Sequence, residues 1–183
     1  MAQCKIDRGS AFDCANLEQA GIGNFVQLIN KDDLDNGAIT EDAVSHEIET
    51  ITLDTGTYAY PFESFKGSVH ITPSSPMRKV TSVDGFDHQV VVMAFDASQL
   101  SRENIAKMRF QKVVAIIPLL NGKSIMYGRN VGLRISEYEE LPSDPDKGGM
   151  IQFTLKTPEN DPPEVAPPCL IADTFDITSL QSV

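Results

Sequence analysis

Hydrophobic and polar positions alternate over much of this chain with a period of two, the spacing that turns one side of a β-strand toward a core. Ile151, Phe153 and Leu155, for example, are separated by Gln152 and Thr154. This alternation indicates strands that bury one side. By the same reasoning we expect strands over residues 24–30, 48–53, 80–83, 86–95, 131–136 and 150–156.

One segment breaks this period. Ser98 and Ser101 are both residue types that cap helix N-termini, and the residues after them suit a helix that ends near Phe110. Ile105 and Met108 lie three positions apart, on one helix face, so we expect them to pack the helix against a sheet. The sequence therefore predicts one helix over about residues 98–110.

Turn signals predict hairpins between the strands. Asn121-Gly122 follows the apolar run 112–120, and this pair is favoured in two-residue turns, where both central residues need positive φ. Asp84-Gly85 is a favoured pair of the same kind. A further hairpin is expected where the strand that begins near Tyr58 reaches Lys66-Gly67.

Aromatic side chains are concentrated in one of these strands. Core packing explains such a run, because aromatic residues in strands are ordinarily interior. The alternative is a protruding hairpin whose rings dock on a neighbouring molecule, since aromatic residues are enriched at interfaces. The residues concerned are Tyr58, Tyr60, Phe62 and Phe65.

Short strands separated by Gly, Pro and Asx turns, with a single helix, indicate a mainly β protein: an antiparallel β-sandwich or barrel with one flanking helix. We place this domain at residues 1–156 and interpret the acidic stretch 137–149 as an exposed loop. Residues 157–183 differ, because their prolines favour an extended, stiff arm. The arm carries apolar residues that should dock on a neighbouring subunit or else fold back over their own sheet: Leu170, Ile171, Phe175, Ile177 and Leu180.

Composition narrows the classes of function. The chain has 183 residues, of which 41% are hydrophobic, as expected for one well-cored domain. Its net charge of −11 argues against binding to nucleic acid, because affinity for the phosphate backbone comes from clustered Lys and Arg. Acidity of this kind commonly serves solubility alone, and the alternative is that it suits the wall of a conduit for DNA. No stretch is apolar and long enough for a membrane helix and no signal peptide is visible, so we expect no membrane partner.

Sequence motifs for catalysis, cofactors or metals are absent. Gly21-Ile22-Gly23 lacks the preceding strand of a dinucleotide fingerprint, and no Gly-x-Ser-x-Gly occurs. The histidines lie far apart without ligand spacing: His46, His70 and His88. The cysteines are odd in number and lack metal spacing, which predicts reduced thiols, although a bridge between the first two stays open: Cys4, Cys14 and Cys169. We therefore expect no enzyme activity, no cofactor and no metal.

The order and spacing of the elements also carry a resemblance. A helix is followed by an apolar strand, the turn Asn121-Gly122-Lys123, Tyr127-Gly128 and Gly132-Leu133. The ends add Cys4, Arg8-Gly9, Phe12-Asp13-Cys14, and the run 150–163 from a last core strand into a proline-rich tail. This arrangement resembles the tail-tube and tail-ring proteins of phages, especially of phages that infect Bacteroidota.

The resemblance implies a helix-flanked β-sandwich that is a virion structural protein, a subunit of a tail tube or tail ring in a hexamer or larger ring. Its partners would be further copies and neighbouring tail or portal-proximal proteins, and DNA would pass through an acidic lumen without specific binding. The protein would be made in the host cytoplasm and reside in the virion tail. The subunit-interface residues that we expect are Tyr58, Tyr60, Phe62, Phe65, Leu170, Ile171, Phe175 and Ile177.

Two other interpretations stay open. A non-viral β-sandwich that serves as a binding or adhesion module would use the proline-rich segment as a linker. A small enzyme with a site assembled from loops would require a deep pocket with converging polar groups.

Overall fold

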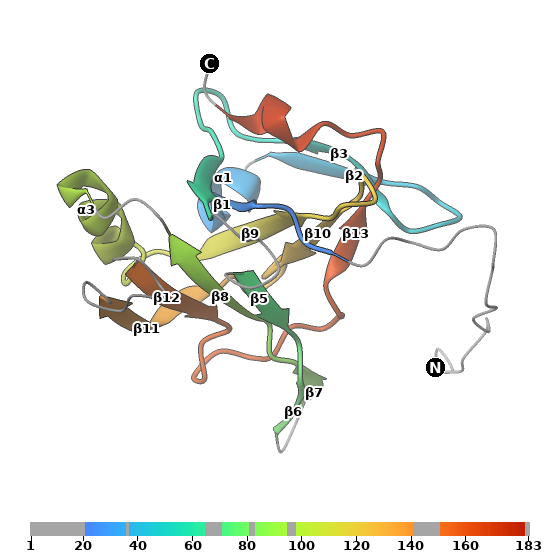
Figure 1. Ribbon diagram of the computed structural model, residues 1–183. Coiled ribbons are helices and arrows are strands. Elements are labelled where there is room, and N and C mark those ends of the chain that lie inside the picture. Colours follow the sequence, from blue (N-terminus) through green and yellow to red (C-terminus); the bar gives the residue numbers. More distant parts are fainter. Residues whose placement is uncertain are drawn as a thin grey trace.

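The computed structural model describes residues 21–35, 37–64, 71–80, 83–94, 98–140 and 151–181 (Figure 1). They form a mainly β structure with a helix packed beside it, which confirms the expected fold class. In chain order the elements are β1 (Phe25–Asn30), α1 (Lys31–Asp35), β2 (Ala38–Glu41), β3 (Ile48–Thr52), β4 (Tyr60–Glu63), β5 (Ile71–Ser74), β6 (Met77–Val80), β7 (Val83–Phe86), β8 (Gln89–Ala94), α3 (Gln99–Lys107), β9 (Val113–Pro118), β10 (Ser124–Tyr127), β11 (Arg134–Glu140), β12 (Ile151–Lys156), β13 (Cys169–Ile171) and η1 (Ile177–Leu180).

Two sheets face each other across an apolar core. The larger sheet has the strand order β2-β3-β13-β10-β9-β1-β4, the smaller one has the order β11-β12-β8-β5, and β6 and β7 form a separate ribbon. Phe153 and Val92 from the smaller sheet, Leu28 from the larger sheet and Ile105 from α3 meet in this core. The expected packing of the helix on the sandwich is therefore confirmed, with Ile105 and Met108 both buried.

A second apolar core lies on the other side of the larger sheet. It contains Leu34 of α1, Ile48 of β3 and Ile171 of β13. The central strand β9 serves both cores, because its alternate residues face opposite sides. This explains why its sequence is a continuous apolar run, as expected for a strand covered on both faces. Val113, Ala115 and Ile117 face the first core, whereas Val114 and Ile116 face the second.

The C-terminal segment is an integral part of the domain, so the expected extended arm and the boundary at residue 156 were wrong. β13 lies inside the larger sheet, antiparallel to β10 and parallel to β3. Ile171 is fully buried, and Ile177 and Leu180 are 7% exposed. In Figure 1 this red segment runs from β12 around the sandwich to β13 and returns beside β2 and β3. The apolar side chains cover their own sheet, and the prolines occupy the connecting loop, where few backbone donors are needed.

The hairpin at Asn121-Gly122 is confirmed in position but differs in its turn. The Leu119 N–H donates to the Lys123 carbonyl at 2.8 Å, so this pair closes a loop of three residues, 120–122. Gly122 has a φ of 89°, whereas Asn121 has no positive φ. The Asn121 side chain instead accepts a hydrogen bond from the Lys123 N–H. One left-handed residue is sufficient in a three-residue loop of this kind.

Two other expected turns were wrong. Gly85 pairs with Arg78 within the β6–β7 ladder, so Asp84-Gly85 lies in a strand, and residues 81–82 lie outside the described residues. A Cβ on Gly85 would lie 2.5 Å from the Glu164 carbonyl oxygen. Close packing against the C-terminal segment therefore explains why this position is a glycine. β4 pairs with β1 and β5 pairs with β8, in different sheets, so they do not form a hairpin.

The segment after β10 also departs from expectation. β11 extends to Glu140 and pairs with β12, so the first four residues of the expected loop 137–149 are strand residues. Residues 141–150 lie outside the described residues. A register shift between Ile135 and Glu137 interrupts the alternation of side chains, which explains why the end of the strand was not apparent from a period of two.

Candidate functional site

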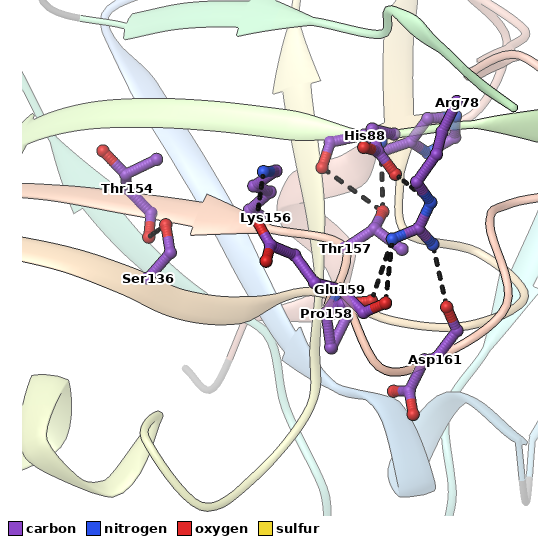
Figure 2. A network of polar contacts seen from close by, with 10 residues as sticks. Arg78, His88, Ser136, Thr154, Lys156, Thr157, Pro158, Glu159 and Asp161 are labelled. Carbon is purple, nitrogen blue, oxygen red and sulfur yellow. Dashed lines mark hydrogen bonds and ion pairs between the residues drawn. The ribbon is translucent and has the colours of Figure 1, made fainter. Parts of the chain in front are cut away.

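Polar side chains gather where the C-terminal segment leaves β12 and crosses the β6–β7 ribbon (Figure 2). His88 and Thr157 lie at the ends of neighbouring strands, with side chains almost fully buried. The Thr157 N–H donates to the His88 carbonyl at 2.9 Å, and the His88 N–H donates to the Thr157 hydroxyl at 3.0 Å. These bonds extend the β8–β12 ladder by one step beyond its last strand residues.

Both ring nitrogens of His88 have partners within the protein. The Gly128 N–H donates to Nδ1 at 3.0 Å, and Nε2 lies 3.1 Å from the Ala166 carbonyl oxygen. A ring that accepts at Nδ1 and donates at Nε2 is a neutral imidazole. Burial lowers the pKa of His88, although the nearby Glu164 carboxylate, the Ala166 carbonyl and Asp87 oppose this shift. The ring therefore fastens the C-terminal segment to β10 as an uncharged group.

Glu164 is fully buried, and its carboxylate accepts three backbone hydrogen bonds. The donors are the N–H groups of Asn130, Val131 and Gly132, at 3.1, 2.8 and 3.3 Å. Its backbone exchanges two hydrogen bonds with Phe86 of β7. The buried carboxylate thus supplies hydrogen-bond acceptors to three consecutive N–H groups, of which that of Gly132 belongs to a buried residue.

Arg78 of β6 holds the start of the C-terminal segment. Its guanidinium donates to the carbonyl oxygens of Pro158, Glu159 and Asp161, at 3.4, 3.3 and 2.8 Å (Figure 2). Its Nε lies 3.0 Å from a carboxylate oxygen of Asp87, an ion-pair distance without the alignment of a hydrogen bond. Figure 2 shows the guanidinium directed at the loop that follows Thr157.

Because these groups bond to one another and to the backbone, the network acts as an internal clamp on the C-terminal segment. Sequence reasoning missed it. His88 shares a strand face with Val90 and Val92, and this apolar neighbourhood was the available signal for its burial. Glu164 lies in a proline-rich stretch that carried no signal, because its partners are more than thirty residues away.

The aromatic residues expected at an interface occupy two environments. Tyr58 and Tyr60 are 44% and 51% exposed beside the outer strand of the larger sheet. Phe62 is partly buried, with its ring 5.6 Å from that of Phe153 in an edge-on contact. Phe65 lies outside the described residues. The core interpretation therefore suits Phe62, and the two tyrosines remain accessible to a partner.

The apolar residues expected at the end of the arm are mostly packed inside the domain. Ile171 and Ile177 belong to the second core, and Phe175 packs against that core while partly buried. Leu170, on the opposite face of β13, is 39% exposed. Ile171 and Ile177 therefore expose little or no surface to a neighbouring subunit, whereas Leu170 is exposed and Phe175 is half-buried.

The free edge of β4 is poorly suited to pairing with another strand. The Ser64 N–H donates inward to Asn24, whereas the Ala59 N–H donates outward to the Leu180 carbonyl at 2.8 Å. Because backbone groups alternate along a strand, Pro61 faces outward, and proline has no N–H. One outward donor is therefore used and another is missing, which limits backbone pairing at this edge and favours contacts made by side chains.

Two grooves border α3. One lies between α3 and β11, has a volume of about 530 Å³, and is lined by Ile105, Ile135 and Tyr138 together with Arg102, whose Nε lies 3.2 Å from Glu140. The other lies between α3 and the β1–β4 edge of the larger sheet and has a volume of about 190 Å³.

Within the described ranges, no group of three or more His, Cys, Asp or Glu side chains is placed to hold a metal ion. Nor does any helix in this part of the chain have the length and apolar character to cross a membrane. Cys169 is a free thiol, whereas Cys4, Cys14 and His70 lie outside the described residues. No family model, curated protein or solved structure matches the chain.

Proposed function

We propose that this protein is a virion structural protein of a phage, a subunit that assembles as a ring or tube in the tail and encloses a conduit for DNA. Its role is structural, without catalysis, and its partners are further copies of itself and neighbouring tail or portal-proximal proteins. The number of copies is that of a hexamer or a larger ring. Its place is the virion tail, after synthesis in the host cytoplasm.

The observation that carries this proposal is a helix-flanked β-sandwich whose larger sheet has exposed strands at both edges. β2 and β4 are the outermost strands of that sheet, and most of their residues are exposed or half-buried. A ring requires two different contact surfaces on each subunit, so that one surface of a copy meets the other surface of the next. The two opposite edges supply such a pair.

The charge of the chain supports the conduit. With 26 acidic and 15 basic residues, the protein repels nucleic acid rather than holding it. A wall that attracted DNA would slow its passage, whereas an acidic wall lets the genome move without binding.

Negative-stain microscopy of the purified protein, and of particles labelled with an antibody against it, tests the proposal. We expect rings or short tubes from the purified protein at rising concentration, and label on the particle tail. Light scattering provides the copy number of the assembled species. A protein that stays monomeric at all concentrations and is absent from particles would contradict the proposal.

The groove of about 530 Å³ beside β11 favours a second candidate, a non-viral binding or adhesion module. Such a module would capture an extended peptide between a helix and a strand edge. Binding of a peptide library to the monomer, together with absence from phage particles, would favour this candidate over the tail subunit.

A further inference from the structure

The smaller groove beside α3 has an apolar floor and an exposed, partly basic rim. Leu28, Phe62 and Met108 contribute to its lining, while Tyr60 and Lys107 line it and are exposed. Its volume of about 190 Å³ is well above the roughly 10 to 15 Å³ that one water molecule needs. An apolar side chain from another molecule therefore has room to enter.

The chain around this groove is basic in an otherwise acidic protein. Residues 107–112 contain Lys107, Arg109 and Lys112 and no acidic residue. Lys112 pairs with Asp161 at 2.8 Å, and Arg109 lines the larger groove, between α3 and β11. Lys107 lines the smaller groove and forms no ion pair with another described residue. This rim is suited to a partner that carries negative charge.

The β2–β3 hairpin carries the opposite charge and an apolar tip. Residues 41–49 contain four acidic residues and no Lys or Arg. Glu41 and Glu47 pair with Arg129 and Lys123, whereas Asp42 and Glu49 form no ion pair with another described residue. Val44, at the tip, is 68% exposed. The tip is ordered by hydrogen bonds, because the Asp42 carboxylate accepts from the Val44 and Ser45 N–H groups, which lowers the pKa of Asp42 and keeps it ionised.

These two surfaces lie at opposite edges of the larger sheet. The groove borders β4 and β1, whereas β2 is the outermost strand at the other edge of the same sheet. Figure 1 shows α3 at one side of the molecule and the β2–β3 turn at the other. The tip and the groove of one molecule are thus separated by the width of the sheet.

We propose that the β2–β3 tip of one copy docks in the α3 groove of the next copy. Val44 enters the apolar floor, and the acidic residues of the hairpin, Asp42 and Glu49, lie against Lys107 at the rim. The occupant is a second copy because the complementary surface is present on this chain itself. A contact between two different surfaces repeats from copy to copy and generates a ring when the rotation closes. This inference rests on the proposed function, for which it supplies the subunit contact.

The β4 edge explains why this contact is made by side chains. With Pro61 facing outward and the Ala59 N–H already bonded, the edge beside the groove offers few donors for strand pairing. A tip that inserts into a groove avoids this restriction. Negative charge on one surface and positive charge on the other also makes the association dependent on ionic strength.

Sedimentation of matched variants tests the contact. We expect Val44→Ser to weaken self-association about tenfold, the size for one aliphatic side chain removed from an interface. Lys107→Glu should also weaken it by several-fold, because attraction becomes repulsion. The controls are Val165→Ser, at a residue that is 78% exposed elsewhere, and Lys79→Glu, which makes the same charge change on the β6–β7 ribbon. Thermal melts verify that all four variants are folded.

Zero-length carbodiimide crosslinking locates the contact directly. In a mixture of unlabelled and ¹⁵N-labelled full-length protein, we expect links between Lys107 and the acidic residues of 41–49 that join one labelled and one unlabelled peptide. If every link joins two peptides that carry the same label, the contact lies within one molecule and the proposal is overturned.

The outcomes separate this contact from the proposed function. One outcome is that the wild-type protein forms rings, or that the antibody against it labels the particle tail, while Val44→Ser and Lys107→Glu self-associate as strongly as their controls. In that case the proposed contact is wrong and the proposed tail function stands. Crosslinks from Lys107 to a different tail protein, with none between copies, would likewise overturn the contact. A wild type that stays monomeric and is absent from particles would overturn both.

Discussion

The side chains of His88 and Glu164 are buried, and each joins segments of the chain that are distant in sequence. Each takes its partners from residues far along the chain, Gly128 and Ala166 for the histidine and 130–132 for the glutamate. A buried polar side chain with all partners in place favours one arrangement over others, because any alternative leaves donors or acceptors unpaired.

Replacing Glu164 should therefore be costly. Glu164→Ala removes the acceptor of three backbone N–H groups inside the protein, and we expect the free energy of unfolding to fall by about 3 kcal/mol or more. Glu159→Ala is the control, since that side chain is exposed and pairs with Lys156 at the surface, where the effect should stay within about 1 kcal/mol. Urea denaturation measures both. Equal losses for the two variants would contradict the clamp.

His88 should make stability depend on pH. Because burial lowers its pKa in the folded protein below the ordinary value of 6.5, the unfolded chain binds the proton first as the pH falls. The free energy of unfolding should be highest above that value and decrease as the pH falls through the lower pKa of the folded state. Denaturation curves between about pH 7.5 and 5 measure the slope.

The control for this pH dependence uses the exposed histidine. His46→Asn removes the exposed imidazole and serves as the comparison for His88→Gln, and asparagine tolerates the positive φ of 60° at that position. His88→Gln should lower the stability at neutral pH but remove the contribution to the slope. A slope that is unchanged in His88→Gln would assign the pH dependence to other groups.

At the scale of elements, α3 is held to the sandwich mainly by one face. Ile105 is 2% exposed in the first core, so Ile105→Ala should lower the free energy of unfolding by about 2 to 4 kcal/mol. Leu100→Ala, on the same helix but 67% exposed, should change it by less than about 0.5 kcal/mol. Thermal melts compare the two, and an unchanged midpoint for Ile105→Ala would contradict this packing.

The C-terminal segment is the element whose role the structure changed most. Because β13 fills the place between β10 and β3, deletion of residues 164–183 should prevent formation of the native domain rather than leave its melting temperature unchanged. The deletion also removes Ile171, Ile177 and Leu180 from the second core. Circular dichroism and heteronuclear NMR spectra of the truncated chain provide the test, and a cooperative melt at the wild-type temperature would contradict it.

At the scale of the whole molecule, charge is distributed unevenly. The net charge is −11, yet residues 107–112 are basic and lie beside an exposed groove. We expect no saturable binding of duplex DNA at physiological salt, because this short basic stretch is small against the overall repulsion. Gel shifts at low and physiological salt measure this, and tight, saturable binding would contradict the conduit proposal.

The sequence by itself determined the local elements. The alternation in 150–156 placed Ile151, Phe153 and Leu155 in the core, and the cap at Ser98 placed the start of the helix. These features depend on the periodicity and chemistry of adjacent residues, which the sequence displays directly. The mainly β sandwich with a flanking helix followed from the same local signals.

Only the tertiary structure decided the partners of each element. β4 and β5 separated into different sheets, β13 entered the larger sheet beside two strands distant in sequence, and Glu164 met its three donors across the fold. The tertiary structure likewise decided which aromatic residues are exposed, such as Tyr60, and which pack against the core, such as Phe62. The physical reason is that these outcomes depend on which apolar surfaces cover one another and which polar groups are paired after burial, and both are properties of contacts between residues remote along the chain.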